Sequence, residues 1–275
     1  MHPVPILTYH ATNITGNDYV TNDHVALAAD LRLIDTLGYT IVPLECVVHA
    51  LLEGASLPDK ALAITLDDGT DFDYRDILHP SYGMQQSMFN ILDAFRKEAG
   101  ITRQPWLHIT SFVIVSPEAR QDLDAYGMAG TGWFNHDWWI PAARSGRMAI
   151  ANHSWDHNLS GVRTASPRIR RDTFTCIDTP EQADFQIRQA RDFIRRLLPR
   201  HAPVRLFAYP FGEGNDFLLK EYFPRGCVHT GTLAAFSTEP APVGTGANRW
   251  FLPRYVCGQH WNSPQALEYL LNHAV

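Results

Sequence analysis

Short apolar segments alternate with helical patterns along nearly the whole chain. Each apolar segment has the length of a strand, and strands that alternate with helices usually form a parallel sheet. So many units in one chain favour a barrel over two separate domains. The predicted strands are Val4–Tyr9, Thr40–Leu44, Ala61–Leu66, Leu107–Val115, Arg147–Asn152, Val204–Tyr209, Cys227–Leu233 and Trp250–Val256.

Helix signals lie between these segments. Apolar residues recur at helical spacing over Leu27–Leu37 and again around Ile91 and Phe95. The sequence Thr179-Pro-Glu-Gln is a capping box with proline in the first turn, and Ser263-Pro264 marks the start of the last helix.

Two long polar insertions, Thr70–Met88 and Ser116–His136, interrupt this alternation. Loops of that length in a compact domain often form the walls of a functional site. We found no internal repeat and no linker, so we expect one domain over residues 1–275. The predicted fold is α/β, a distorted (β/α) barrel of about seven parallel strands with long loops at the strand carboxyl ends.

Composition narrows the possible partners. The chain has 275 residues and a formal net charge of -6, which argues against a nucleic-acid partner or an anionic membrane surface. No apolar run approaches the ~20 residues of a transmembrane helix. The first residues lack the features of a signal peptide, so we expect a cytoplasmic protein unless a leader directs export. The sequence leaves the oligomeric state open.

The four cysteines are widely separated and include no CxxC pair. This spacing argues against a cysteine zinc site and against a disulfide framework.

The third predicted strand ends in two adjacent carboxylates, Asp67 and Asp68, followed by Gly69. Adjacent carboxylates raise each other's pKa unless a cation separates their roles. Asp-Asp-Gly is also a common turn sequence, so the pair alone does not establish a site. Functional residues in a parallel barrel gather at the carboxyl ends of strands, however, and the pair lies there.

A second polar group follows the fifth predicted strand. His153 and His157 are four residues apart, which on a helical turn would place both imidazoles on one face. Such a pair can also be solvated or cap a helix. Together with a carboxylate from another strand end, two histidines form a frequent catalytic zinc set. One aspartate could then bind the cation while the other remains free as a base.

Three motifs resemble those of the polysaccharide deacetylases, the NodB-homology or carbohydrate esterase family 4 proteins. TLDDG (65–69) resembles their first motif, NHSWDH (152–157) the second and AYPFG (208–212) the third. PILTYHAT (5–12) and LPRYV (252–256) are similar to segments of the poly-N-acetylglucosamine deacetylase subgroup. The motifs occur in family order and cover nearly the whole chain.

The resemblance implies a NodB-type barrel and specific roles. Asp68, His153 and His157 match the ligands of one divalent metal ion, by default Zn²⁺, with Co²⁺, Ni²⁺ or Fe²⁺ also compatible. Asp67 matches the general base. Phe211 occupies the position whose backbone N–H helps to hold the oxyanion.

Two departures from the family pattern affect the remaining roles. Ala208 stands where the family has an arginine that orients the catalytic aspartate, and Arg254 is a candidate to replace that arginine or to contact substrate. The last family motif, Leu-x-His, has no literal match. His260 is the first candidate for the general acid and His229 the second, although either could be an ordinary surface or hydrogen-bonded histidine.

Aromatic residues around the histidine motif fit a sugar site, because aromatic faces stack on pyranose rings. We expect Trp138 and Trp155 to contact the substrate together with Tyr9 and His10, although Trp138 could instead be part of the core.

These observations predict a metal-dependent hydrolase that removes N-acetyl groups from an N-acetylated oligo- or polysaccharide. A deformylase or amidase acting on a small non-polymeric amide is one alternative. A degenerate, non-catalytic sugar-binding module is the other.

Overall fold

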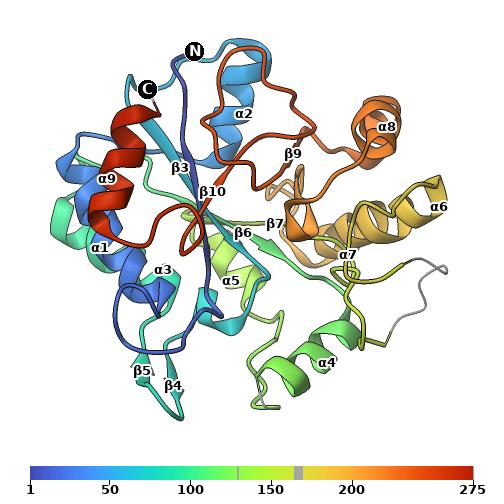
Figure 1. Ribbon diagram of the computed structural model, residues 1–275, viewed down its shortest axis with the longest axis horizontal. Helices are drawn as coiled ribbons and strands as arrows, with labels where there is room; N and C mark the ends of the chain where they lie inside the picture. Colours follow the sequence, from blue (N-terminus) through green and yellow to red (C-terminus); the bar gives the residue numbers. More distant parts are fainter. Residues whose placement is uncertain (129, 164–169, 275) are drawn as a thin grey trace.

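The centre of the computed structural model is a curled parallel sheet (Figure 1). Residues 1–128, 130–163 and 170–274 are described. The strand order is β10-β1-β3-β6-β7-β8-β9, and β2 pairs with β3 beside this path. The strands are β1 (Ile6–His10), β2 (Thr40–Ile41), β3 (Ala61–Asp67), β6 (Ile109–Val113), β7 (Met148–Asn152), β8 (Leu206–Ala208), β9 (Ala234–Phe236) and β10 (Tyr255–Val256).

Helices cover the outside of this sheet. In Figure 1, α1, α3 and α9 lie together on one side, while α6, α7 and α8 lie on the other. The helices are α1 (Asp23–Thr36), α2 (Leu44–Glu53), α3 (Met88–Ala99), α4 (Pro117–Gly127), α5 (Trp139–Arg144), α6 (Pro180–Ala183), α7 (Gln189–Leu197), α8 (Phe223–Thr230) and α9 (Pro264–His273). Short 3-10 or π turns also occur along the chain: η1 (Asp71–Asp73), η2 (Asp184–Arg188), η3 (Pro210–Gly212) and η4 (Leu218–Tyr222).

Alternate side chains of the strands face two different cores. Ala63, Phe112 and Ala151 belong to one buried cluster that includes residues from both ends of the sheet. Phe112 and Phe236 come from strands that are not neighbours, yet their ring centroids are 5.7 Å apart, so this cluster fills the concave side. The intervening residues, such as Ile64, pack against the outer helices.

The two ends of the sheet approach each other. Leu252 forms a parallel bridge with Phe236 of β9, and the chain then continues into β10, which pairs with β1. The predicted distorted barrel of about seven parallel strands is therefore confirmed.

The start signals of two predicted helices are confirmed. Thr179 and Gln182 form a reciprocal capping box at α6, and the Ser263 side chain accepts a hydrogen bond from the Ala266 N–H at α9. No helix among the described residues is both long and apolar enough to cross a bilayer.

Three predicted strands need correction. The one over 250–256 is limited to β10, Tyr255–Val256. The strand over 227–233 is wrong, because a helical segment that begins at Leu218 continues through α8, and Gly231 (φ 60°) separates it from β9. The strand over 40–44 is shorter than predicted. Pro43 has no N–H for a sheet and instead precedes the first turn of α2, a helix that the sequence analysis did not identify.

Both polar insertions contain regular structure. The first holds η1 and an antiparallel hairpin of β4 (Ile77–His79) and β5 (Gly83–Gln85). The second holds α4, which begins with Ser116-Pro117, the same N-cap and proline signal as α9. The sequence analysis did not predict α4, although the helix carries this signal.

Candidate active site

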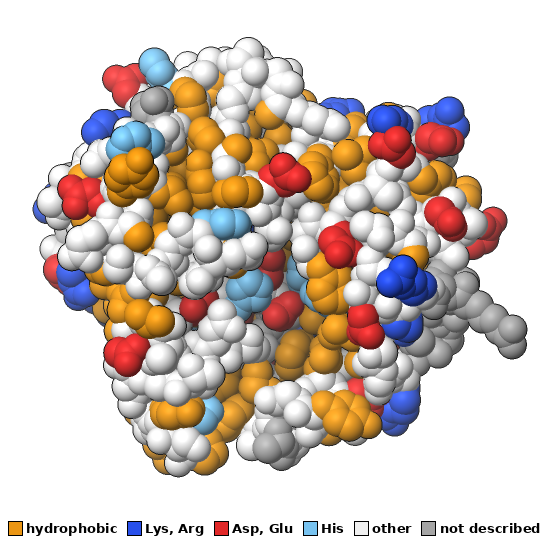
Figure 2. Space-filling model, in the orientation of Figure 1, with side chains coloured by type: hydrophobic (Ala, Val, Ile, Leu, Met, Phe, Trp, Pro, Cys, Tyr) orange, Lys and Arg blue, Asp and Glu red, His pale blue; other side chains and the backbone are white. Residues whose placement is uncertain are grey.

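The carboxyl ends of the strands surround a cavity of about 480 Å³. His10 ends β1, Asp67 and Asp68 lie at the end of β3, His153 follows β7, and Phe211 follows β8. Figure 2 shows the cavity as a hollow near the centre of this face, with histidine and acidic side chains at its floor. The structure therefore brings together five residues from four separate segments of the sequence.

Asp68 lies in a tight turn whose backbone restricts its side chain. Asp68 has φ 74° and Gly69 has φ 72°, in the left-handed region that non-glycine residues rarely adopt. A Cβ on Gly69 would lie 2.4 Å from Val113 Cγ1, so only glycine fits beside β6. The Ile114 N–H donates to the Asp68 carbonyl at 3.1 Å. The turn is thus fixed between β3 and the end of β6.

The histidine segment is also a loop, and the expected helical turn is wrong. Ser154, His157 and Asn158 all have positive φ, of 73°, 58° and 53°. The Ser154 Oγ accepts from the His157 N–H at 3.0 Å and Asn152 Oδ1 accepts from the Ser154 N–H at 2.9 Å. These local side-chain bonds replace helical ones and still bring the two imidazoles together.

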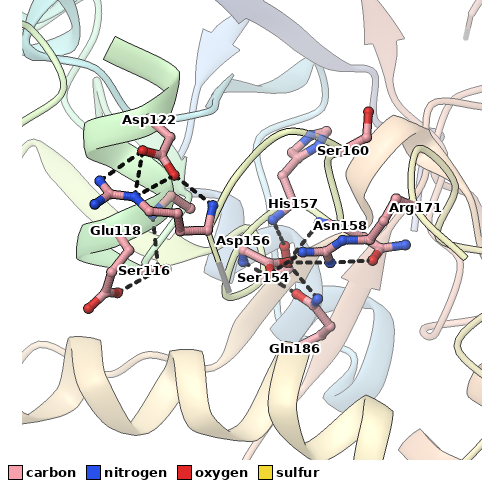
Figure 3. Close-up of polar contacts among 12 residues, drawn as sticks. Ser116, Glu118, Asp122, Ser154, Asp156, His157, Asn158, Ser160, Arg171 and Gln186 are labelled. Carbon is pink, nitrogen blue, oxygen red and sulfur yellow. Dashed lines mark hydrogen bonds and ion pairs between the residues drawn. The ribbon is translucent and has the colours of Figure 1, made fainter. Parts of the chain in front are cut away.

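A buried polar network supports this loop from behind (Figure 3). Asp156 accepts a hydrogen bond from Gln186 Nε2 at 2.6 Å and pairs with the Arg171 guanidinium at 2.9 Å. Arg171 also donates to Asn158 Oδ1 at 2.7 Å. Because Asp156 is fully buried, these partners compensate its charge and fix the residues on either side of His157. The sequence analysis did not single out any of the four.

The three predicted ligands form a group that could hold a metal ion. His153 Nε2 and His157 Nε2 lie 3.6 and 3.7 Å from Asp68 Oδ1, too far for hydrogen bonds. Donor atoms around a tetrahedral zinc ion are separated by about 3.3 Å, given the usual ligand distances. The observed separations are therefore close to those of a metal site.

Both histidines are in the neutral form that can bind a metal ion. Burial lowers the pKa of both His153 and His157 to about 4, so both rings are neutral near pH 7. His153 Nδ1 lies 2.9 Å from the Ala208 carbonyl and must donate to it, which leaves Nε2 as a free lone pair facing Asp68. Neutral imidazole nitrogens are the form that binds metals.

Asp67 lies beside this group in a buried ion pair. Both carboxylate oxygens accept hydrogen bonds from Arg254, each at 2.8 Å, and both side chains are buried. Burial acts to raise the pKa of Asp67, but the Arg254 guanidinium and then His153 outweigh it and hold the pKa well below its usual range. Asp67 is therefore ionised at any pH at which the protein would work.

Arg254, the sequence candidate to replace the arginine missing at Ala208, supplies the guanidinium that contacts Asp67. It is fully buried and also donates to the Thr65 hydroxyl and the Ser237 carbonyl. The expectation that Arg254 contacts substrate is wrong, because its guanidinium is enclosed by protein. The alternative expectation, that it orients Asp67, agrees with the geometry.

We predict that Arg254→Met leaves less of Asp67 ionised at acidic pH. Without the guanidinium, burial acts alone and raises the pKa of Asp67, so the acidic limb of the kcat/KM profile moves to higher pH. The unpaired buried carboxylate also costs about 3–5 kcal/mol of stability. This loss is largest above the raised pKa of Asp67 in the folded variant. It shrinks as the pH falls from that value to the usual aspartate pKa of about 3.9, and the remainder vanishes as the pH falls through the lower pKa of the folded wild type. Thermal unfolding and a pH profile measure both effects, and Arg254→Lys should restore part of each. An unshifted acidic limb in Arg254→Met would contradict the role.

Other predicted substrate residues do not reach the cavity. Tyr9 and Trp138 are fully buried, and the Tyr9 hydroxyl donates to Asp30, so the predicted substrate contacts of both are wrong. Trp155 is half-buried and packs against the Phe185 and Phe193 rings, away from the residues that line the cavity. His10 does line it.

Neither candidate for the general acid is found at the cavity among the described residues. His260 is not among the residues lining the cavity, and its Nδ1 accepts a hydrogen bond from the Val256 N–H at 2.7 Å. The side chain of His229 lies outside the described residues. Leu123, Met128 and Phe134 of the second insertion also line the cavity, as the sequence analysis expected for a wall of the site, although it did not predict the helix α4 there.

Comparisons with known proteins agree with this geometry. The family model described as polysaccharide deacetylase matches residues 54–223. No curated protein sequence matches the chain significantly.

Three solved structures share the fold over nearly the whole chain. They are the Streptococcus pyogenes deacetylase PplD in complex with acetate (TM-score 0.64, 16% identity, 98% of each chain covered), a de-N-acetylase from Aggregatibacter actinomycetemcomitans (0.61, 14%, 97% of this chain and 99% of that one) and IcaB from Ammonifex degensii (0.63, 15%, 100% and 97%). The family match covers most of the chain, including the Asp67-Asp68 pair and both motif histidines, and it confirms the resemblance seen in the sequence. The chain belongs to the polysaccharide deacetylase family of hydrolases, which act on carbon–nitrogen bonds other than peptide bonds.

Proposed function

We propose that this protein is a zinc-dependent deacetylase that removes N-acetyl groups from an N-acetylated oligo- or polysaccharide. The observation that carries the proposal is the open cavity in which two neutral histidines and Asp68 lie beside the ionised Asp67. The names of structural neighbours, a deacetylase and a de-N-acetylase, support the same chemistry.

The proposed ligands are Asp68 Oδ1, His153 Nε2 and His157 Nε2. When bound, a divalent ion in this position would polarise the amide carbonyl and lower the pKa of water. The chain's part is to hold the three donors at fixed separations, through the left-handed Asp68 turn and the hydrogen-bonded histidine loop.

Asp67 is the proposed general base. Each of its oxygens accepts one hydrogen bond from Arg254 and keeps a second lone pair, so the carboxylate can accept a proton from the attacking water without leaving the ion pair. Arg254 fixes the orientation of the carboxylate, and such positioning is a large part of what a base contributes.

Phe211 is the proposed oxyanion residue. It lies in the left-handed region with φ 59° inside η3, and its ring packs against the His157 ring at 4.6 Å. Phe211 lines the cavity together with the predicted ligands. A backbone N–H there would donate to the carbonyl oxygen as negative charge develops on it.

His10 replaces His260 as the proposed general acid. It lines the cavity, and its ring interacts electrostatically with Asp67, His153 and His157. The Asp23 carboxylate accepts a hydrogen bond from the His10 N–H at 2.7 Å, which fixes the end of β1. The leaving amine must gain a proton, and we assign its delivery to His10.

The size of the acceptable substrate separates the leading proposal from its alternative. A cavity of about 480 Å³ that opens to solvent and has apolar walls such as Phe134 and Met128 suits a sugar ring within a longer chain. A deformylase or amidase for a small amide would use the same polar centre. The retained ligand set and base argue against a non-catalytic sugar-binding module.

We predict that turnover rises with chain length on N-acetylated glycans. The zinc-loaded protein should hydrolyse chitooligosaccharides or poly-β-1,6-N-acetylglucosamine fragments with a larger kcat/KM than N-acetylglucosamine or small cyclic amides, because remote sugar units add binding energy. Acetate release from the N-acetylated substrates and ring opening of the cyclic amides, measured side by side, provide the comparison. A preference for the small amides would favour the alternative, and no turnover by the metal-loaded protein would favour the binding module.

A further inference from the structure

Arg120 of α4 is buried without a carboxylate hydrogen-bond partner. Its guanidinium donates instead to backbone carbonyls, those of Ile114 at 2.7 Å, Gly69 at 2.9 Å and Phe134 at 3.0 Å, and also to that of Asn135. The side chain is 2% exposed. These carbonyls come from three separate segments of the chain: the turn after β3, the end of β6 and the loop before α5.

A buried cation that contacts only neutral acceptors is costly for stability. Burial lowers the pKa of Arg120 to about 9, and the more distant charges of Asp71 and Asp73 offset only part of this effect. The planar guanidinium makes up to five hydrogen bonds in fixed directions, whereas an ammonium group has three and no fixed fork. The Arg120 contacts use this property, since one side chain joins three loops.

The three segments joined by Arg120 all belong to the site. Gly69 directly follows Asp68, and Ile114 donates its N–H to the Asp68 carbonyl while its own carbonyl accepts from Arg120. Arg120 therefore binds on both sides of the turn that gives Asp68 its positive φ. On the third side, the guanidinium lies 4.6 Å from the centre of the Phe134 ring, which lines the cavity.

We propose that Arg120 is a positioning residue that holds the metal-binding turn of Asp68 in register with the Phe134 wall of the substrate cavity. This inference rests on the proposed function, because it assigns Arg120 a role toward the same metal ligand. The inference goes further because it links the affinity for metal to the affinity for substrate through Arg120, a residue that contacts neither the metal nor the substrate.

The test compares Arg120→Lys with Ser116→Ala. Lysine keeps the positive charge but lacks the planar set of five N–H donors that joins the three segments. We expect its zinc affinity, measured by competition with a chromophoric chelator, to fall by roughly 10–100-fold, as for other residues behind metal ligands. We also expect KM for a chitooligosaccharide to rise. Ser116 caps α4 through the Ala119 N–H. Its replacement should loosen the helix and leave zinc affinity unchanged.

Three outcomes would overturn the inference or its basis. Wild-type zinc affinity and KM in folded Arg120→Lys would refute the inference alone. An equal loss of zinc affinity in Ser116→Ala would show that α4 stability, not the carbonyl contacts, matters. A wild-type protein that binds no zinc would refute the proposed metal centre, and the inference with it.

A measurement on the wild type keeps the inference testable if Arg120→Lys does not fold. Zinc should slow amide hydrogen exchange in residues 133–136 as well as in 67–70, because Arg120 joins the two segments. Protection that is confined to 67–70 and the histidine loop would contradict the proposal.

Discussion

Replacing His153 or His157 with alanine is expected to abolish tight zinc binding and turnover together. Each histidine would supply one of only three protein ligands, and its Nε2 faces Asp68 Oδ1 across a gap of 3.6 or 3.7 Å. The loss in affinity should exceed the roughly 10–100-fold cost of changes behind the ligands. Metal content after dialysis against zinc, together with acetate release, measures both properties on the same sample.

His260→Ala is the matched control for these two variants. His260 was the first candidate for the general acid in the sequence, but it does not line the cavity. The control should therefore keep both its zinc and most of its turnover, whereas His10→Ala should keep zinc and lose turnover. An alanine variant at 153 or 157 that still holds one equivalent of zinc would show that the ligand set is wrong.

The parts of the site that the sequence predicted are those encoded by adjacent residues. Asp67-Asp68-Gly69 follows an apolar strand directly, and the spacing from His153 to His157 lies within one loop. These signals were sufficient to place the predicted ligands at strand ends, even though the histidine segment is a left-handed loop and not a helical turn.

Contacts between distant segments were much harder to predict. Arg254 is 187 positions from Asp67, and only the closure of the sheet through β10 brings its guanidinium to the carboxylate. Trp138 was misassigned for the opposite reason. An aromatic residue suits a sugar site and a core equally well, and burial, which no local pattern reveals, decides between them.

The fold was likewise predicted where local patterns were sufficient and mispredicted where they fitted two structures. Alternating apolar segments predicted the parallel barrel, because burial on both faces of the strands produces them. The error at 227–233 arose because a short apolar run fits a buried helix as well as a strand. There the helix continues from Leu218 and ends before Gly231.

Neutralising the two adjacent aspartates one at a time is expected to remove two different properties, zinc affinity and turnover. Asp68→Asn should lose zinc affinity, because a neutral amide replaces the only anionic ligand in the group. Asp67→Asn should keep its zinc and lose turnover by a factor of about 10² to 10⁴, the usual contribution of a positioned general base. Metal content and kcat/KM of these two variants provide the measurement.

Stability must be followed in the same experiment, because Asp67→Asn leaves Arg254 buried without its counter-charge. That change costs about 3–5 kcal/mol, so the folded fraction is checked by thermal unfolding before rates are compared. Arg254→Met combined with Asp67→Asn removes both charges and should regain part of the lost stability without regaining turnover. If the pair were an ordinary solvated turn, both single substitutions would be mild and alike. Equal effects of Asp67→Asn and Asp68→Asn on zinc and on turnover would therefore refute the division of roles between a base and a metal ligand.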